Sequence, residues 1–342
     1  MIGYYVHHQG RGHLHRAQAL ANALEEPVAG LSSLPPPATW QGPWLRLARD
    51  DAHPPGRDTS AGGQLHWAPE SDPGLRQRAS SISSWIESNR PRLIVVDVSV
   101  EVALLARLHG VPVVSLVLPG RRTDNAHLLG FRASTALVSA APPGTGHLHP
   151  ELPQDVSDRV HFVGAISRFP VRTHRPERIP GPRRVVVLQG QGGGSLTTLE
   201  DLSLRALASD WDWTMIGGPG TWVEDPSALL LHADVVVTNA GESALADVAA
   251  HRRPAIVIPA RRPFDEQQTT AAVLAEEGWP ALVLPEFPTS GWDQVLEHAV
   301  GMDGQRWQDW CDGHAAARLA NLLRSIPHAN ATHAHTAALR SA

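Results

Sequence analysis

A histidine directly after a glycine-rich turn is the first feature of this chain that could do acid–base chemistry. Gly10 and Gly12 follow a short β-rich run, and His13 opens a helical pattern. Glycines let the backbone pass close to a ligand, and a helix N-terminus supplies N–H donors and the positive end of the helix dipole. An imidazole placed there can act as a general base at neutral pH. Spacing alone fits equally well a histidine satisfied by backbone or water.

The same turn does not match a dinucleotide-binding fingerprint. His15 stands where the third glycine of G-x-G-x-x-G is required, and no acidic residue follows the next predicted strand, which ends in Ser32 and Ser33. A nicotinamide-dependent oxidoreductase is therefore disfavoured.

A second glycine-rich turn, in the middle of the chain, could bind an anion. Residues 189–195 follow a predicted buried strand and precede a predicted helix, Leu196–Ala208. Closely spaced glycines can direct successive N–H groups toward one point, which makes an anion-binding nest. The alternative is a flexible turn. The candidate ligand-binding residues here are Gly190, Gly193, Gly194 and Ser195.

A third group of polar residues lies further along the chain, at two helix starts. Asp247 follows Ser243 by one helical turn on the same face, where its carboxylate could accept the protons of ribose hydroxyls. Carboxylates and amides at the next helix start could bind sugar hydroxyls. Each piece alone could be an ordinary helix start with acidic residues, but their order and spacing together favour a ligand site. The candidates are Asn239, Gly241, Glu242, Ser243, Asp247, Asp265, Glu266, Gln267 and Gln268.

The composition narrows the chemistry further. The chain has 342 residues, 29 basic and 34 acidic ones, and every basic residue is arginine. Without lysine there is no Schiff base, no pyridoxal phosphate anchor and no Walker A loop. Any phosphate must be held by arginine, backbone N–H groups or helix N-termini. The net charge of −5 and the lack of a basic half argue against a nucleic acid partner.

The elements that must position these residues alternate between strands and helices, which predicts parallel βαβ units. The predicted class is α/β, with two facing Rossmann-like domains and the active site in the cleft between them. The predicted boundaries are an N-terminal domain (1–167), a proline-rich linker (168–183), a C-terminal domain (184–325) and a tail (326–342). Strands are predicted at Ile2–His7, Val28–Leu31, Leu93–Val98, Val111–Leu118, Thr135–Ala140, Val160–Gly164, Val185–Gln189, Trp213–Ile216, Asp234–Thr238, Ala255–Pro259 and Ala281–Leu284.

The segment Pro35–Trp67 fits this pattern poorly, because a compact βαβ unit would normally stand there. Its prolines and tryptophans predict a long loop. Trp40 and Trp44 could form a lid or an acceptor-docking patch, or they could simply cap the domain. Of the histidines, His7, His8, His15, His147 and His149 have no metal-ligand spacing and are predicted at the surface, so no metal site is expected.

On these motifs the chain resembles GT-B glycosyltransferases of families 28 and 1, the group that includes the UDP-N-acetylglucosamine transferase of peptidoglycan precursor synthesis. Gly10, Gly12 and His13 match the N-terminal loop, and residues 190–195 match the second glycine-rich loop. The resemblance implies that Arg168 grips the diphosphate and that Asp247, six residues after Gly241, binds the ribose, although the family usually has Glu there. It implies that residues 265–268, Asp-Glu-Gln-Gln, read the donor sugar.

The resemblance implies an inverting transfer, without metal or cofactor, from a nucleotide-sugar, expected to be a UDP-sugar, to an acceptor hydroxyl. His13 would take the acceptor proton. Asp97, at the end of a strand, could orient His13 or hold the acceptor, or be an ordinary solvated carboxylate. Residues 10–16 are also similar to the nucleotide-sugar hydrolase of pseudaminic acid synthesis, so a hydrolase or epimerase on the same fold is the alternative.

The expected partners are a nucleotide-sugar donor and a small-molecule or lipid-linked acceptor. No long apolar segment and no secretory start are found, and Cys311 is the only cysteine. The expected location is the cytoplasm, with peripheral contact at the inner membrane face if the acceptor is lipid-linked.

Overall fold

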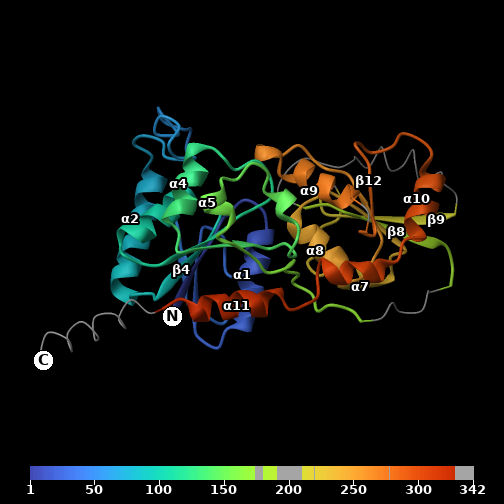
Figure 1. Ribbon diagram of the computed structural model, residues 1–342, viewed down its shortest axis with the longest axis horizontal. Coiled ribbons are helices and arrows are strands. Elements are labelled where there is room, and N and C mark those ends of the chain that lie inside the picture. Colours follow the sequence, from blue (N-terminus) through green and yellow to red (C-terminus); the bar gives the residue numbers. More distant parts are fainter. Residues whose placement is uncertain (174–179, 191–209, 219, 277, 328–342) are drawn as a thin grey trace, which may run out of the picture.

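The computed structural model describes residues 1–173, 180–190, 210–218, 220–276 and 278–327. Two α/β domains lie side by side along the long axis of the molecule (Figure 1). Each domain is built on a parallel sheet with helices on both faces, which confirms the predicted pair of Rossmann-like domains. No helix in these ranges is both long and apolar enough to span a bilayer.

The N-terminal domain contains a seven-stranded parallel sheet with the order β3-β2-β1-β4-β5-β6-β7. Its strands are β1 (Ile2–Val6), β2 (Val28–Ser32), β3 (Trp44–Arg46), β4 (Leu93–Asp97), β5 (Val113–Leu116), β6 (Ala136–Ser139) and β7 (Val160–Phe162). Its helices are α1 (Gly12–Ala23), α2 (Pro73–Asn89), α3 (Val100–Leu108), α4 (Asn125–Ala133), α5 (Gln154–Ser157) and the 3-10 turn η1 (Gly146–Leu148). The strand order reverses between β1 and β4, and open α/β sheets bind ligands beyond the carboxyl ends of such strands.

The C-terminal domain contains a five-stranded parallel sheet with the order β12-β11-β10-β8-β9. Its strands are β8 (Arg183–Leu188), β9 (Trp211–Ile216), β10 (Val235–Thr238), β11 (Ala255–Val257) and β12 (Ala281–Val283). Its helices are α7 (Ser227–His232), α8 (Glu242–Ala250), α9 (Glu266–Ala275), α10 (Trp292–Val300) and the 3-10 segments η2 (Pro263–Asp265) and η3 (Gly304–Asp309). Here the order reverses between β8 and β10, so their carboxyl ends form a second ligand-binding edge.

Side chains that alternate along the central strands bury two apolar layers in each domain. In the N-terminal sheet, Ile2 and Tyr4 of β1 pack on the α1 side, whereas Tyr5 packs with α2 and α3 on the other face. In the C-terminal sheet, Val186 faces α8 and Val187 faces α10. Each central strand therefore has a helix on both of its faces.

The last helix, α11 (Ala315–Ser325), packs on the N-terminal domain although it follows the C-terminal domain in sequence (Figure 1). Its buried side chains Leu319 and Leu323 join the core beneath α1. Arg92 donates a hydrogen bond of 2.8 Å to the carbonyl of Leu323. The chain thus crosses between the domains twice, once in each direction.

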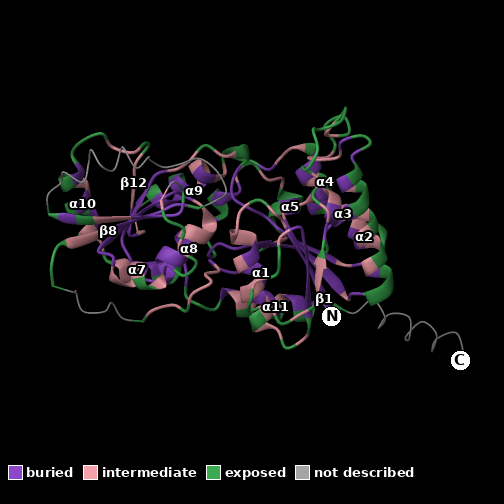
Figure 2. Ribbon diagram, turned by 180° about the vertical axis from the view of Figure 1, so that it is seen from behind, coloured by how far each residue is buried: buried purple, intermediate pink, exposed green. Residues whose placement is uncertain are grey.

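The structure corrects the prediction for Pro35–Trp67 in part, because this segment contains the edge strand β3. Trp44 lies in that strand, and its ring contacts the ring of Trp40 edge to face at 5.0 Å. A Cβ at Gly30 would lie 2.1 Å from the Trp44 ring, so the glycine is needed for this packing. The two tryptophans cap the edge of the domain, and the exposed loop beside α4 is formed by the residues after β3 (Figure 2).

Candidate active site

His13 and Asp97 form a hydrogen-bonded pair at the switch point of the N-terminal sheet. His13 lies in the first turn of α1, Asp97 is the last residue of β4, and Nδ1 lies 2.9 Å from the carboxylate Oδ1. Asp97 is completely buried and also accepts a hydrogen bond of 3.0 Å from the Tyr4 hydroxyl. Because Asp97 contacts Nδ1, the other ring nitrogen of His13 is the one left to accept a proton.

Asp97 is ionised although it is buried. Burial alone would raise the pKa of its carboxyl group, but the charges of Arg16 and His13 and the hydrogen bonds of His13 and Tyr4 lower it to about 2. The Nε atom of Arg16 lies 3.0 Å from Oδ2 of Asp97. The carboxylate can therefore orient the imidazole and stabilise it once it has taken up a proton.

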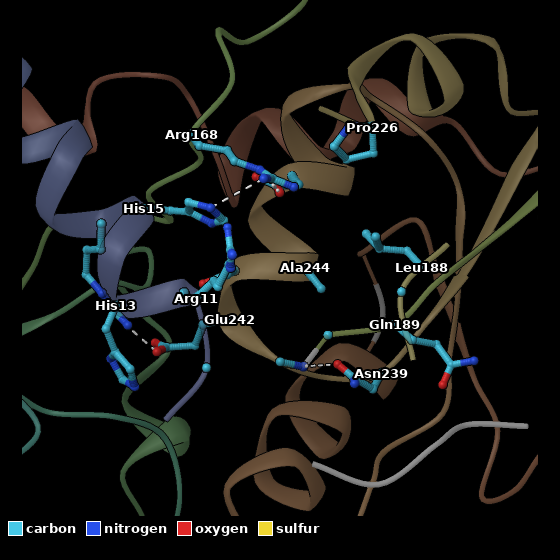
Figure 3. A pocket seen from close by; sticks show the side chains of 18 of the residues that line it. Arg11, His13, His15, Arg168, Leu188, Gln189, Pro226, Asn239, Glu242 and Ala244 are labelled. Atoms are coloured by element: carbon cyan, nitrogen blue, oxygen red, sulfur yellow. Dashed lines mark hydrogen bonds and ion pairs between the residues drawn. The ribbon is translucent and has the colours of Figure 1, made fainter. Parts of the chain in front are cut away.

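A cavity of about 210 Å³ lies between the domains in front of this pair (Figure 3). The start of α1 lines it from the N-terminal domain, and the ends of β8 and β10 with the start of α8 line it from the C-terminal domain. Neither helix start has a side chain that caps its N–H groups. Both helices can therefore direct N–H donors and their positive dipole ends at a bound anion.

Gly12 lies where the two helix starts approach each other closely. A Cβ at this position would lie 2.3 Å from Oγ and 3.2 Å from Cβ of Ser243. If the cavity binds UDP, as the sequence leads us to expect, Gly12→Ala should lower UDP affinity by roughly tenfold, since overpacking typically costs about 1–3 kcal/mol. Calorimetric titration with UDP measures this.

The matched control is Gly146→Ala, because no atom lies within 4 Å of a Cβ built there. The double variant Gly12→Ala with Ser243→Ala removes the contacted hydroxyl and should regain part of the affinity. Wild-type affinity in Gly12→Ala alone would show that the close approach is irrelevant to binding.

Arg168 and Asp247 lie in direct contact on the wall of the cavity. Asp247 is buried and accepts a hydrogen bond of 3.0 Å from Nε of Arg168 and one of 2.8 Å from Oγ of Ser167. Arg168 also donates to the carbonyl of Glu224 at 3.2 Å. Burial raises the pKa of Asp247, although the Arg168 charge acts in the opposite direction. The residues predicted to bind diphosphate and ribose are therefore partners of one another.

The segment predicted to read the sugar contacts the N-terminal domain. Phe264 and Asp265 both have left-handed backbone angles, with φ of 61° and 54°. The carbonyl of Phe264 accepts a hydrogen bond of 2.7 Å from the N–H of Arg121, and a Cβ at Gly120 would lie 2.2 Å from this carbonyl. Such backbone strain persists only where the surroundings hold it, and here the opposite domain does so.

The side chains of this segment have different roles. Glu266 pairs with Arg122 of the N-terminal domain at 3.2 Å and lines the cavity. Gln267 also lines the cavity, but its Oε1 accepts a hydrogen bond from the N–H of Ala260. Gln268 donates to the carbonyl of Ala260 instead. The two glutamines therefore hold the loop after β11 in place.

Most of the residues singled out in the sequence line this one cavity: Gly12, His13, Arg168, Gly190, Asn239, Gly241, Glu242, Ser243, Asp247, Glu266 and Gln267. Asp97 lies behind His13, and Asp265 and Gln268 do not line the cavity. Gly193, Gly194 and Ser195 lie outside the described residues.

Sequence reasoning gives no role to several residues that line the cavity: Arg11, His15, Arg16, Gln189, Trp222 and Arg262. A signal for Arg16 is present, because it follows His13 by three residues and so lies on the same face of α1. His15 is predicted at the surface, but it is part of the cavity wall, and burial lowers its pKa to about 4. The surface prediction is also wrong for His149, which is buried beside Ser139.

Among the described residues, the ion pairs that span the cleft all have the same orientation of charge. In each pair the arginine lies within residues 1–168 and the carboxylate lies in the C-terminal domain. The pairs are Arg11–Glu224 at 3.3 Å, Arg16–Glu242 at 3.3 Å, Arg121–Asp265 at 3.5 Å, Arg122–Glu266 at 3.2 Å and Arg168–Asp247 at 3.0 Å.

Two groups of histidine and aspartate elsewhere in the N-terminal domain are close enough to hold a cation. In the first, Asp124 caps α4 through the N–H of His127 and contacts His66 at 3.0 Å. The guanidinium of Arg122 lies 3.2 Å from Nε2 of His127. The second group joins His8 to aspartates that arginines already neutralise. Because an arginine occupies each group, we assign neither of them to a metal.

The fold is similar to that of solved glycosyltransferases, over nearly the whole chain. It aligns with the glycosyltransferase of kitacinnamycin at a TM-score of 0.66 and 16% identity, over 95% of this chain and 99% of that one. It aligns with MurG of Acinetobacter baumannii at 0.61 and 14%, over 95% and 99%. It aligns with SnogD of Streptomyces nogalater at 0.55 and 17%, over 99% of both chains.

The sequence itself carries one family match. Residues 221–286, which include α8 and α9, match the glycosyltransferase family 28 C-terminal domain. No curated protein sequence matches the chain. The chain therefore has the fold of these glycosyltransferases, and residues 221–286 are similar to the family 28 C-terminal domain.

Proposed function

We propose that this protein transfers a sugar from a nucleoside diphosphate sugar, with UDP as the first candidate, to an acceptor hydroxyl, with inversion and without a metal ion. The observation that carries the proposal is the His13–Asp97 pair, which lies across the cavity from the uncapped start of α8. One wall of the cavity thus offers a base and the other an anion-binding surface. A displacement at an anomeric carbon needs both, since the base takes the acceptor proton and the anion-binding surface stabilises the leaving diphosphate.

In this mechanism His13 removes the proton of the acceptor hydroxyl as the oxygen attacks the anomeric carbon. The bond to the diphosphate breaks, and the leaving group departs from the opposite face of the sugar. A single displacement of this kind inverts the anomeric configuration. Asp97 stabilises the imidazolium that forms, because it is ionised and lies 2.9 Å from Nδ1.

The charge on the departing diphosphate would be stabilised by the starts of α1 and α8 and by Arg168. Preorganised N–H groups and a guanidinium can fill the role that a divalent cation has in other transferases. Glu266 and Gln267 on the adjoining wall would contact sugar hydroxyls. Two neighbours of the same fold support a nucleoside diphosphate as the ligand class, since UGT89C1 of Arabidopsis thaliana is complexed with UDP and the rhamnosyltransferase SpnG with thymidine diphosphate.

A donor screen tests the proposal. The protein is incubated with UDP- and dTDP-sugars, with and without candidate acceptors, and released nucleotide is measured beside mass spectrometry of the products. A transferase should release nucleotide slowly without an acceptor and rapidly with one, and EDTA should not change these rates. NMR should show that the sugar in the product has the inverted anomeric configuration. Rapid release without acceptor would assign the alternative, a nucleotide-sugar hydrolase. Release of no nucleotide from any donor would refute both.

Asp247 gives a sharper test of how the donor is held. We expect Asp247→Asn to weaken UDP binding by roughly tenfold to 100-fold, as hydrogen bonds to charged groups contribute about 1.5–3 kcal/mol. If Asp247 binds the ribose, the loss should already be present for uridine. If it acts through Arg168, uridine should bind normally and only UDP should lose affinity.

Calorimetric titration with uridine, UMP and UDP separates these two roles. The control is Asp293→Asn, an exposed aspartate on α10 that does not line the cavity. Wild-type affinity of Asp247→Asn for all three ligands would remove Asp247 from the donor site.

A further inference from the structure

Arg16 joins residues of both domains. Its Nε lies 3.0 Å from Oδ2 of Asp97 in the N-terminal domain, and its Nη1 donates to Oε2 of Glu242 in the C-terminal domain at 3.3 Å. The Arg16 side chain is 6% exposed, Asp97 is completely buried, and the Glu242 side chain is 15% exposed. A continuous row of charges therefore runs from His13 through Asp97 and Arg16 to Glu242.

Glu242 lies at the edge of the C-terminal domain that faces Arg16. It is the first residue of α8, directly after Gly241, and it lines the same cavity as His13 (Figure 3). Its Oε1 atom is buried and accepts no hydrogen bond from the described residues. Arg16 is thus a charged partner of the α8 carboxylate across the cleft.

We propose that Arg16 and Glu242 are positioning residues through which the C-terminal domain sets the basicity of His13. The proposal rests on the assignment of His13 as the base. Without Glu242, Arg16 would act on Asp97 with its full charge and weaken the hold of Asp97 on a protonated His13. Because Glu242 offsets the charge of Arg16, Asp97 favours the imidazolium more strongly and His13 is a better base.

The other groups around His13 do not replace this effect. On β1, His7 lies edge to face with His13 at 5.9 Å, and burial lowers the pKa of His7 to about 3, so it stays neutral. Tyr4 donates to Asp97 and, being buried, has a raised pKa. Burial raises the pKa of Glu242, the charge of Arg16 lowers it, and Glu266 on α9 raises it further, although Glu266 pairs with Arg122. Arg16 and Glu242 are therefore the pair of opposite charges through which one domain acts on the base of the other.

Two substitutions should move the titration midpoint of His13 in opposite directions. Glu242→Gln leaves the Arg16 charge unopposed, so the midpoint of His13 should move to lower pH. Arg16→Met removes the cation beside Asp97, so the midpoint should move to higher pH. Charges at these separations should displace the midpoint by about 0.5 to 2 on the pH scale.

The experiment is an NMR titration of the histidine C–H signals in the intact protein, with the His13 signal assigned from its loss in His13→Gln. The matched control is Glu224→Gln, which removes a carboxylate from another ion pair of the cleft, with Arg11, that does not contact Asp97. It should leave the His13 midpoint at the wild-type value. If Arg16→Met does not fold, the comparison of the His13 midpoints in Glu242→Gln and Glu224→Gln is sufficient to test the proposal.

A His13 midpoint that stays in place or rises in Glu242→Gln overturns the proposal. So does an equal displacement in Glu224→Gln. Because the titration needs no donor, its result is separate from the donor screen. If the His13 midpoints move as expected but the protein releases no nucleotide from any donor, the proposed reaction is refuted and the electrostatic link between the two domains is still supported.

Discussion

Replacing His13 by alanine is expected to lower turnover by about two to four orders of magnitude, the usual contribution of a general base. The acceptor hydroxyl would then have to lose its proton to water, while the donor would still be held by α8 and Arg168. UDP affinity should therefore stay near the wild-type value, so the loss is confined to kcat. Released nucleotide gives the rate, and calorimetry gives the affinity.

His109→Ala is the control for this substitution, because His109 is exposed and its Nε2 lies 2.9 Å from the hydroxyl of Ser83 on α2, away from the cavity. It should turn over donor at the wild-type rate. If His13→Ala also keeps near-wild-type turnover with a true donor and acceptor, His13 is not the base. If His13→Ala instead loses UDP affinity, the histidine serves in donor binding.

Local sequence patterns are sufficient to predict the two parallel sheets. The buried runs at Leu93–Val98 and Asp234–Thr238 are largely apolar because helices cover both faces of their strands, and they form β4 and β10. The helical pattern of Gln305–Leu323 does not form one continuous helix. The structure has the 3-10 segment η3 and then α11, separated at Gly313, whose φ is 85°.

Two elements escape prediction because their signals are weak in the sequence. The strand β3 has three residues and follows a proline-rich turn, so its pairing with β2 depends on the sheet that is already present. The helix α2 begins with Pro73 after its capping residue Asp72, whose carboxylate accepts from the N–H of Leu75 at 2.6 Å. That proline and cap are a helix-start signal that apolar periodicity alone does not use.

The cavity could be predicted because topology brings separate motifs to one place. Loops after β1, β8 and β10 all follow the carboxyl ends of parallel strands at positions where strand order reverses. Gly12 and Gly241, which are far apart in sequence, therefore line one cavity between the facing sheets. The pairing of Arg168 with Asp247 could not be predicted in this way, because side-chain contacts between domains leave no local periodicity.

The absence of lysine has its structural counterpart in the cleft. Among the described residues the cations of the ion pairs that span it are all arginines, and Arg16 contacts Asp97 and Glu242 with different nitrogens of one guanidinium. A lysine ammonium concentrates its charge on one atom and could not reach both carboxylates in this geometry. Arginine at this position can thus serve both domains at once.

Asp97→Asn is expected to reduce activity as strongly as the loss of His13 and, unlike it, to destabilise the fold. Asparagine cannot balance a protonated His13, so turnover should fall by about two to four orders of magnitude. It also leaves Arg16 buried with only Glu242 as a charged partner among the described residues. Breaking a buried ion pair typically costs about 3–5 kcal/mol. The lower end, about 3 kcal/mol, is expected because Glu242 remains.

The pH dependence of this destabilisation identifies its cause. The pKa of Asp97 is lowered from 3.8 to about 2 in the folded protein. Its ionisation therefore adds about 2 kcal/mol of stability above pH 4, and this contribution is lost as the pH falls toward 2. Asparagine does not titrate, so the difference between wild type and Asp97→Asn should be largest near pH 7 and smaller at pH 3.

Urea unfolding midpoints at both pH values test this expectation, with Asp293→Asn as the exposed control. An equal loss of stability at pH 7 and pH 3 would mean that Asp97 contributes through shape and hydrogen bonding alone. If Asp97→Asn loses less stability at pH 3 than at pH 7, and Asp293→Asn behaves like the wild type at both pH values, then the charge of Asp97 stabilises the buried Arg16. The same carboxylate then has two linked roles, since the negative charge that keeps Arg16 buried is also the charge that would stabilise a protonated His13.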